Sequence, residues 1–253
     1  MEHRFHTPDP VELAVKVPAG DLEVETVDSE ETTIDVDGSD KLVEQTVVEQ
    51  RGRTISVELR GRTAFGITIS IGDFSFGSGN QLKIRARIPH GSDAEIDGAA
   101  LDVEVRGRIR QLQTRSASGD LVLDGEVERD ATVKTVSGDV RLDRVGGNLR
   151  VQSVSGDLRA LAVEGSVELK SVSGDMEVRS VREGRVNATS VSGDIEIGVA
   201  PGTNLDVDAG SVSGDLTSEV PLANDPGAGV GDGPTLVVRG KTVSGDFKVF
   251  RAS

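Results

Sequence analysis

The stretches 151-VQSVSGDLRA-160, 169-LKSVSGDMEV-178 and 188-ATSVSGDIEI-197 repeat one short unit, and this unit decides the fold. Its tripeptide Ser-Gly-Asp occurs seven times, beginning at Ser118, Ser137, Ser155, Ser173, Ser192, Ser213 and Ser244. Successive copies are 19, 18, 18, 19, 21 and 31 residues apart. A nearly fixed period is typical of repeats that stack on one another, because no single unit can bury its own apolar face.

The residues after each Ser-Gly-Asp alternate between apolar and free positions, as in Leu158-Arg159-Ala160. This period of two indicates a strand with one buried face. A second strand precedes each corner, for example 166-SVEL-169, and begins after a glycine turn such as Glu164-Gly165. One period therefore reads as strand, glycine turn, strand and Ser-Gly-Asp corner.

Stacking such coils pairs each strand with its own copy one rung along. The sequence therefore predicts an all-β fold, a parallel β-solenoid (β-helix) with about 18–19 residues per coil. The alternative is an antiparallel sandwich of hairpins, which explains the alternation but not the recurrence of residue types column by column. We expect a single domain over residues 1–253, with irregular coils in 1–90 and regular repeat coils in 91–253.

The corner of each repeat has its own pattern. Glycine suits the turn because it reaches positive φ easily, and aspartate suits it because its carboxylate accepts backbone hydrogen bonds. With the valine of Ser-Val-Ser-Gly-Asp pointing inward, the two flanking hydroxyls are expected to point outward and to bond from rung to rung; ice or glycan binding is the alternative. The structural corner residues are Gly119, Asp120, Gly138, Asp139, Gly156, Asp157, Gly174, Asp175, Gly193, Asp194, Gly214, Asp215, Gly245 and Asp246.

Stacked aspartates would repel one another, so something must compensate their charge. Hydrogen bonds from backbone N–H groups or serine hydroxyls are the favoured explanation. A row of cations such as Ca²⁺ is the weaker one, because calcium-binding coils use a shorter repeat with more glycine. The metal candidates under that second explanation are Asp139, Asp157, Asp175 and Asp194. We expect no cofactor.

Two segments interrupt the regular pattern. Residues 64–79 (AFGITISIGDFSFGSG) combine β-branched residues with little charge and predict a hairpin. This hairpin either caps the core or offers an apolar edge for self-association or a protein partner. The side chains of such a surface would be Phe65, Ile67, Ile69, Phe74 and Phe76. Residues 221–234 are rich in proline and glycine and predict a surface loop.

Composition excludes several classes of function. The 28 basic and 43 acidic residues give a net charge of −15, which disfavours nucleic acid as a partner. No apolar run is long enough for a transmembrane helix, and the first residues lack the apolar core of a secretory signal. The chain has no cysteine. We therefore expect a cytoplasmic protein.

Catalysis is not expected. The three histidines, His3, His6 and His90, lie outside the repeats, and the carboxylates are spread evenly instead of clustering in one coil. No phosphate loop, nucleophile elbow or metal-ligand pattern occurs.

The motifs SVSGDL, KTVSGDV and QSVSGDL, with VPAGDLEVET near the start and TVSGDFKVF near the end, resemble the bacterial DUF4097 family of proposed adhesins. The resemblance extends from about Pro10 to Arg251. It implies a protein built of β-strand repeats, and a related group of adhesin-head-like proteins implies right-handed winding. It implies no catalytic residue.

Together these observations predict a non-enzymatic scaffold or protein-interaction solenoid that self-assembles through its ends by strand addition. The first alternative is a surface adhesin that binds glycan or protein ligands. The second is a β-helical carbohydrate-active enzyme.

Overall fold

The computed structural model describes residues 1–60, 81–219 and 233–252 of the chain. The predicted hairpin over 64–79, including Phe65, Ile67, Ile69, Phe74 and Phe76, lies outside the described residues. Most of the predicted loop over 221–234 also lies outside them.

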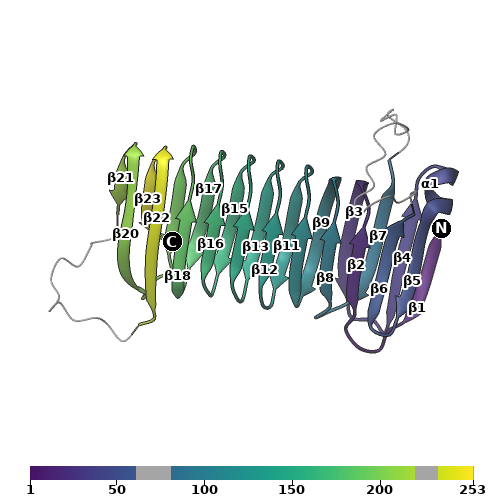
Figure 1. Ribbon diagram of the computed structural model, residues 1–253. Coiled ribbons are helices and arrows are strands. Elements are labelled where there is room, and N and C mark those ends of the chain that lie inside the picture. The colour runs from purple at the N-terminus through teal and green to yellow at the C-terminus, as the bar shows by residue number, and fades with distance from the viewer. Residues whose placement is uncertain (61–80, 220–232, 253) are drawn as a thin grey trace.

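Within the described residues, the strands form two facing sheets that run the length of the stack (Figure 1). The larger sheet has, in spatial order, β1 (Glu2–His6), β4 (Glu31–Asp37), β7 (Lys83–Pro89), β3 (Ala19–Val27), β9 (Ala100–Ile109), β11 (Leu121–Val127), β13 (Val140–Val145), β15 (Leu158–Val163), β17 (Met176–Val181), β19 (Ile195–Val199), β23 (Phe247–Arg251) and β21 (Leu216–Ser218). The smaller sheet has β20 (Asn204–Ser213), β22 (Thr235–Ser244), β18 (Gly184–Thr189), β16 (Val167–Lys170), β14 (Leu149–Gln152), β12 (Ala131–Lys134), β10 (Gln111–Arg115), β8 (Asp93–Asp97), β2 (Glu12–Lys16), β6 (Thr54–Leu59) and β5 (Thr46–Arg51).

Equivalent residues of successive repeats lie side by side. Val140 pairs with Leu158, and Leu158 pairs with Met176, in parallel register. On the other sheet, Leu149 pairs with Val167 in the same way. The all-β architecture of stacked parallel strands that the repeat predicted is therefore confirmed, and the antiparallel sandwich is wrong for the repeat region.

One hydrophobic core fills the space between the two sheets. It consists almost entirely of valine, leucine, isoleucine and alanine, because alternate residues of every strand point inward. Phe247 in β23 is the largest fully buried side chain. The backbone of Gly240 leaves the room that this ring occupies, since a Cβ at residue 240 would lie 1.9 Å from a ring carbon.

Chain order and spatial order differ near both ends of the stack. The first coil, β2–β3, lies between the β6–β7 coil and the β8–β9 coil. The last coil, β22–β23, lies between the β18–β19 coil and the β20–β21 coil. The first and last coils are thus each covered by a coil on both sides.

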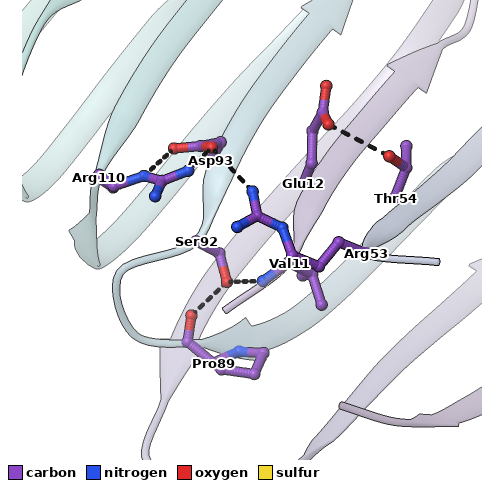
Figure 2. A network of polar contacts seen from close by, with 8 residues as sticks. All are labelled: Val11, Glu12, Arg53, Thr54, Pro89, Ser92, Asp93 and Arg110. Atoms are coloured by element: carbon purple, nitrogen blue, oxygen red, sulfur yellow. Dashed lines mark hydrogen bonds and ion pairs between the residues drawn. The ribbon is translucent and has the colours of Figure 1, made fainter. Parts of the chain in front are cut away.

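Figure 2 shows how the chain is held where it steps over the β2–β3 coil. The buried Ser92 hydroxyl donates to the Pro89 carbonyl at 2.7 Å and accepts the Val11 N–H at 3.0 Å. Arg110 donates twice to the Asp93 carboxylate, which Arg53 also approaches. The Ser92–Val11 bond fastens the start of β8 to the start of the inserted coil, and the Asp93 carboxylate joins β8 to Arg110 beside β10 and to Arg53 beside β6.

The N-terminal end of the stack is covered by elements that break the parallel pattern. Strand β4 runs antiparallel to β7, β1 runs antiparallel to β4, and β5 runs antiparallel to β6. The short helix α1 (Asp40–Gln45) joins the two sheets at this end, and its Leu42 and Val43 pack against the core. The described part of the first 90 residues thus combines the parallel strands β2, β3, β6 and β7 with an antiparallel cap.

Candidate interaction surfaces

The Ser-Gly-Asp corners stack so closely that only glycine fits. Gly156 has φ of 109°, and a Cβ added to it would lie 2.3 Å from the carbonyl oxygen of Gly138 one rung away. The same positive φ and the same contact recur at Gly138, Gly174 and Gly193. The corner therefore requires glycine for two reasons: L side chains rarely adopt this φ, and a Cβ would clash with the neighbouring rung.

The side chains before each glycine point opposite to the prediction. Valine was expected inside and the hydroxyls outside, but the valines are exposed and the preceding Ser or Thr points inward. The inward hydroxyl donates to the carbonyl of the residue two positions on, at 2.5–3.3 Å, in six corners. The serine that directly precedes the glycine bonds between rungs: the hydroxyls of Ser118, Ser137 and Ser155 each donate to a backbone carbonyl of the neighbouring rung.

The error has a simple cause. Counting back by twos from Leu158 through Gly156 places Val154 inward, but the chain turns at Gly156 and the alternation starts afresh. Counting forward from Leu149 and Val151 in the preceding strand places Ser153 inward and Val154 outward, as observed. The alternation of a strand does not continue through a glycine corner.

The exposed corner residues form a continuous row, which we call the valine ridge. In spatial order the ridge consists of Ala117, Val136, Val154, Val172, Val191, Val243 and Val212. The Val136, Val154, Val172 and Val191 carbonyls each accept an N–H from the next rung, at 2.8–2.9 Å. The backbone under the ridge is therefore fixed.

The corner aspartates form a second row, which we call the aspartate ladder. Oδ1 of each aspartate accepts the backbone N–H of the aspartate on the next rung at 2.8–3.0 Å. In spatial order it runs through Asp102, Asp120, Asp139, Asp157, Asp175, Asp194, Asp246 and Asp215. The four metal candidates lie in its middle, where backbone N–H groups compensate one carboxylate oxygen of each.

The ladder ends at Asp215, on the last rung of the stack. Its N–H donates to Asp246, but within the described chain its own carboxylate accepts no hydrogen bond. Among the described strands, the rung to which it belongs, β20–β21, pairs only toward the interior, with β22 and β23. Leu216 of this rung, which lies over the buried Phe247, keeps 48% of its surface exposed.

The position of this open rung at the end of the stack was not predicted from the sequence. Asp215 belongs to the sixth copy of the repeat, whereas chain order predicts that the seventh copy ends the stack. The signal was the interval of 31 residues before Ser244. An interval of that length lets the chain step back over one rung.

Charged side chains border the ridge on its two sides. The aspartate ladder lies on the side of the larger sheet, three residues after each ridge residue. On the side of the smaller sheet, two residues before each ridge residue, lies a column of exposed cations with no carboxylate. This cation column consists of Arg115, Lys134, Lys170 and Lys241, with the neutral Gln152, Thr189 and Gly210 at its other three positions. Two of its cations also pair with carboxylates outside the column, Arg115 with Asp97 and Lys170 with Glu168.

Ion pairs on the outer faces link neighbouring rungs. Arg150 donates to Glu168 across one rung at 2.7 Å, and Arg159 donates to Glu177 in the same way. Lys170 also donates to Glu168, and these two cations hold the pKa of the Glu168 carboxyl below its ordinary value. Such exposed pairs contribute little stability each.

The described residues do not gather a metal-binding cluster. Among them, no three His, Asp or Glu side chains converge in a way that would hold a metal ion. Two of the three histidines have local partners: His90 bonds the Thr26 hydroxyl at 2.8 Å, and His3 stacks on Phe5. None of the helices described is both long and apolar enough to traverse a bilayer.

Comparison with known proteins identifies the family to which the chain belongs. The Toastrack DUF4097 family matches residues 11–250. A proposed adhesin from Parabacteroides distasonis has a similar crystal structure, with a TM-score of 0.59 at 13% identity over 98% of this chain and 96% of that one. A proposed adhesin from Bacteroides fragilis has a TM-score of 0.57 at 16% identity over the same shares. No curated protein matches the chain.

Proposed function

The chain belongs to the Toastrack DUF4097 family, and we propose that it is a non-enzymatic interaction scaffold that associates through its C-terminal rung. The observation that carries this proposal is the asymmetry of the stack. The N-terminal end is covered by antiparallel strands and a helix, whereas the β20–β21 rung has an outer edge that pairs with no other described strand. Such an edge is a template for added strands.

The terminal rung offers three kinds of contact to an incoming rung. Alternate backbone groups of β20 point away from β22, because parallel pairing uses every second residue. The Asp215 carboxylate is ready to accept one more backbone N–H. The half-exposed Leu216 and the partly buried Val207 would be covered by apolar side chains of the added rung.

A second copy is the simplest source of that rung. Two C-terminal ends related by a two-fold axis perpendicular to the sheets would pair β20 with β20 and β21 with β21, both antiparallel. Because the N-terminal end is capped, growth stops at this isologous dimer instead of continuing into a fibre. This differs from assembly through both ends, which the sequence led us to expect.

Leu216→Lys tests the proposal, because it places a charge at the centre of the open rung without disturbing a buried side chain. Light scattering over a wide concentration range is expected to give a dimer for the wild type and a monomer for Leu216→Lys. Leu161→Lys is the matched control, since Leu161 is an exposed leucine on the outer face of β15. A wild type that stays monomeric at every concentration, or a Leu161→Lys variant that dissociates equally, would overturn the proposal.

A surface adhesin is the second candidate, favoured by the fold shared with two proposed adhesins. It requires export, so fractionation of the native host that recovers the protein only from the cytoplasm would exclude it. A carbohydrate-active enzyme is disfavoured, because the described carboxylates and cations pair with one another along the stack instead of converging on one groove.

The architecture within this proposal is one solenoid over the whole chain, right-handed, with 18–19 residues in each regular coil. The register supports the coil length, since Val140, Leu158 and Met176 pair in turn. The handedness is supported by the strong preference of parallel crossovers for right-handed connection.

A further inference from the structure

We propose that the valine ridge is a second interaction surface, which binds the valine ridge of another copy of this chain with the two solenoids side by side and pointing the same way. The inference is independent of the association through the C-terminal rung, because it uses a different face of the stack.

The ridge collects most of the exposed apolar side chains. Nine large hydrophobic residues are exposed in the described chain, and six of them are ridge valines. Their exposed fractions are 52% for Val136, 46% for Val154, 49% for Val172, 50% for Val191, 49% for Val243 and 81% for Val212. Scattered exposed leucines are ordinary on protein surfaces, whereas a continuous apolar row marks a site of contact.

Local structure does not explain why these positions are valine. The inward Ser or Thr closes the corner, the glycine permits its turn and the aspartate bonds the next rung. The ridge side chain takes part in none of these bonds and contacts solvent. A polar residue at Val154 or Val172 would leave the corner intact, so the row of valines points to a partner that covers it.

A second copy matches the ridge in spacing. Successive ridge residues are one rung apart, about 4.8 Å, so seven positions span about 29 Å. A second ridge has the same period, so its valines remain in step with the first along the whole length. A partner without this repeat would fall out of step after a few rungs.

The charges beside the ridge select the relative direction of the two copies. When two ridges face each other and the solenoids are parallel, a two-fold axis along the stack places the cation column of each copy opposite the aspartate ladder of the other. When the solenoids are antiparallel, cations face cations and the two ladders face each other. Opposite charges across an interface favour one arrangement and like charges exclude the other.

The area of the ridge determines how tightly two copies are expected to bind. A length of about 29 Å and a thickness of about 10 Å between sheets give about 300 Å² per copy before the flanking side chains are counted. A standard stable interface buries about 800 Å² on each partner. We therefore expect a weak dimer that forms at high local concentration and dissociates on dilution.

Single cysteines test the arrangement, because the wild-type chain contains none. Val136→Cys and Val191→Cys are made separately, and each variant is oxidised mildly and run on a non-reducing gel. In the parallel arrangement each residue lies opposite its own copy, so both variants are expected to form disulfide-linked dimers. Leu161→Cys, an equally exposed position off the ridge, measures random collision, and the ridge cysteines should react at least about tenfold faster.

The outcomes separate the alternatives. In an antiparallel pair, only a residue near the two-fold axis meets its own copy, so cross-linking at one position but not the other would overturn the parallel arrangement. Rates equal to that of Leu161→Cys at both positions would overturn the ridge interface altogether. Dimers joined at their C-terminal rungs hold the two copies of residue 136 many rungs apart, beyond the Cα separation of about 4.4–6.8 Å that a disulfide allows.

Charge reversal provides a second readout. Lys134→Glu with Lys170→Glu turns the cation column acidic and is expected to slow cross-linking of Val136→Cys by at least about tenfold. The same pair of changes should leave association through Leu216 intact. Cross-linking that is unaffected by these substitutions would overturn the charge argument for the parallel direction.

Discussion

The N-terminal end of the stack is covered by antiparallel strand pairs, whereas the C-terminal end of the described stack is a rung that is parallel to its neighbours. At the first end, β1, β4 and β5 form antiparallel edges and α1 joins the sheets over the core. At the second, β20 and β21 have the form of one more repeat, with Leu205, Val207 and Ala209 only partly covered. Figure 1 shows this contrast at its two extremities.

The contrast shows two ways in which a stack of repeats can end, with a covered rung or with an open one. Stacked repeats require capping units, because the terminal rung exposes apolar side chains and backbone groups. The antiparallel cap here presents short, charged edges such as Glu2–His6, which discourage further pairing. The C-terminal rung lacks such protection among the described residues, and the aspartate ladder points out of it. Among the described residues, one end is therefore covered and the other presents an open strand edge.

Both ends nevertheless share one device, the insertion of the chain's own first or last coil beneath a neighbouring coil. The β2–β3 coil and the β22–β23 coil each have a partner on both sides. To unfold locally, each of these coils therefore has to lose its strand pairing on two sides, whereas the terminal rung loses it on one. We expect both inserted coils to be more protected from hydrogen exchange than the β20–β21 rung.

The largest effect is expected from Phe247→Ala, which removes the one large ring from the C-terminal core. Phe247 is fully buried in the coil that links the terminal rung to the rest of the stack. Loss of the ring and the cavity it leaves should lower the free energy of unfolding by about 3–5 kcal/mol in urea titration. Hydrogen exchange should accelerate first in β20 and β21.

Leu42→Ala is the matched change at the other end. Leu42 in α1 is only partly buried against the core, so the loss should be about 1–2 kcal/mol, with exchange accelerating in β5 and β6. Equal losses for the two variants, or exchange that accelerates throughout the stack in both, would show that the ends are not separate units and would remove the contrast.

The repeat made the middle of the stack predictable. Where the repeat is interrupted, the order of the coils could not be predicted. Val140, Leu158 and Met176 could be aligned because each corner carries the same residues, and like sequence adopts like structure. The family was also recognised from these corners, and the match over residues 11–250 confirms it. Strand pairing, core residues and family thus follow from one periodic signal.

The order of the coils could not be predicted in the same way. Nothing in Glu12–Lys16 distinguishes a strand that begins the stack from one inserted between two later coils, because its alternation is the same in both. The inserted strand pairs with β6 and β8, and the Ser92 hydroxyl bonds Val11 across 81 positions of the chain. Contacts between residues so far apart leave no local pattern.

The ridge was missed for a different reason. The alternation around Val154 can be counted from either neighbouring strand, and the two counts disagree at the corner. Only the inward hydroxyl of Ser153, which bonds the Ser155 carbonyl at 2.9 Å, settles the choice. A hydroxyl placed before a small turn often bonds its own backbone, and this preference could have favoured the correct side.

A smaller effect is expected from removing one step of the aspartate ladder, and it should depend on the position in the stack. Asp157→Ala deprives the Asp175 N–H of its acceptor and should cost about 0.5–1.5 kcal/mol. Asp215→Ala removes a carboxylate that accepts no bond within the described chain, so its cost should stay within about 0.5 kcal/mol. Urea unfolding at a concentration where the protein is monomeric measures both.

Asp157→Asn is the control, because the amide oxygen can still accept the N–H while the charge is lost. If Asp157→Asn destabilises as much as Asp157→Ala, charge rather than the hydrogen bond governs the ladder. If Asp215→Ala costs as much as Asp157→Ala, the last rung is not the end of the ladder, and the contrast between the two ends has to be revised.

The smallest effect is expected from pH, at the rung beside the N-terminal cap. Lys83 in β7 donates to Glu23 in β3 at 2.6 Å, and this hydrogen bond, with the positive charge of Lys83 and Arg85, lowers the pKa of the Glu23 carboxyl from 4.5. Because the folded pKa lies below the unfolded one, the pair stabilises fully above the unfolded pKa. That contribution is lost as pH falls through the folded pKa.

Glu23→Gln keeps the shape of the side chain but cannot titrate, so its urea midpoint should fall less steeply with acid than that of the wild type. The difference between the two proteins should be small, since the pair is partly exposed and screened. It should also shrink as salt is added. Because Glu23 and Lys83 join the inserted β2–β3 coil to the β6–β7 coil, the acid-dependent opening should begin on the N-terminal side, where exchange in β3 and β7 would report it. Exchange that begins instead in β20 and β21 at low pH would assign the acid-sensitive step to the open end.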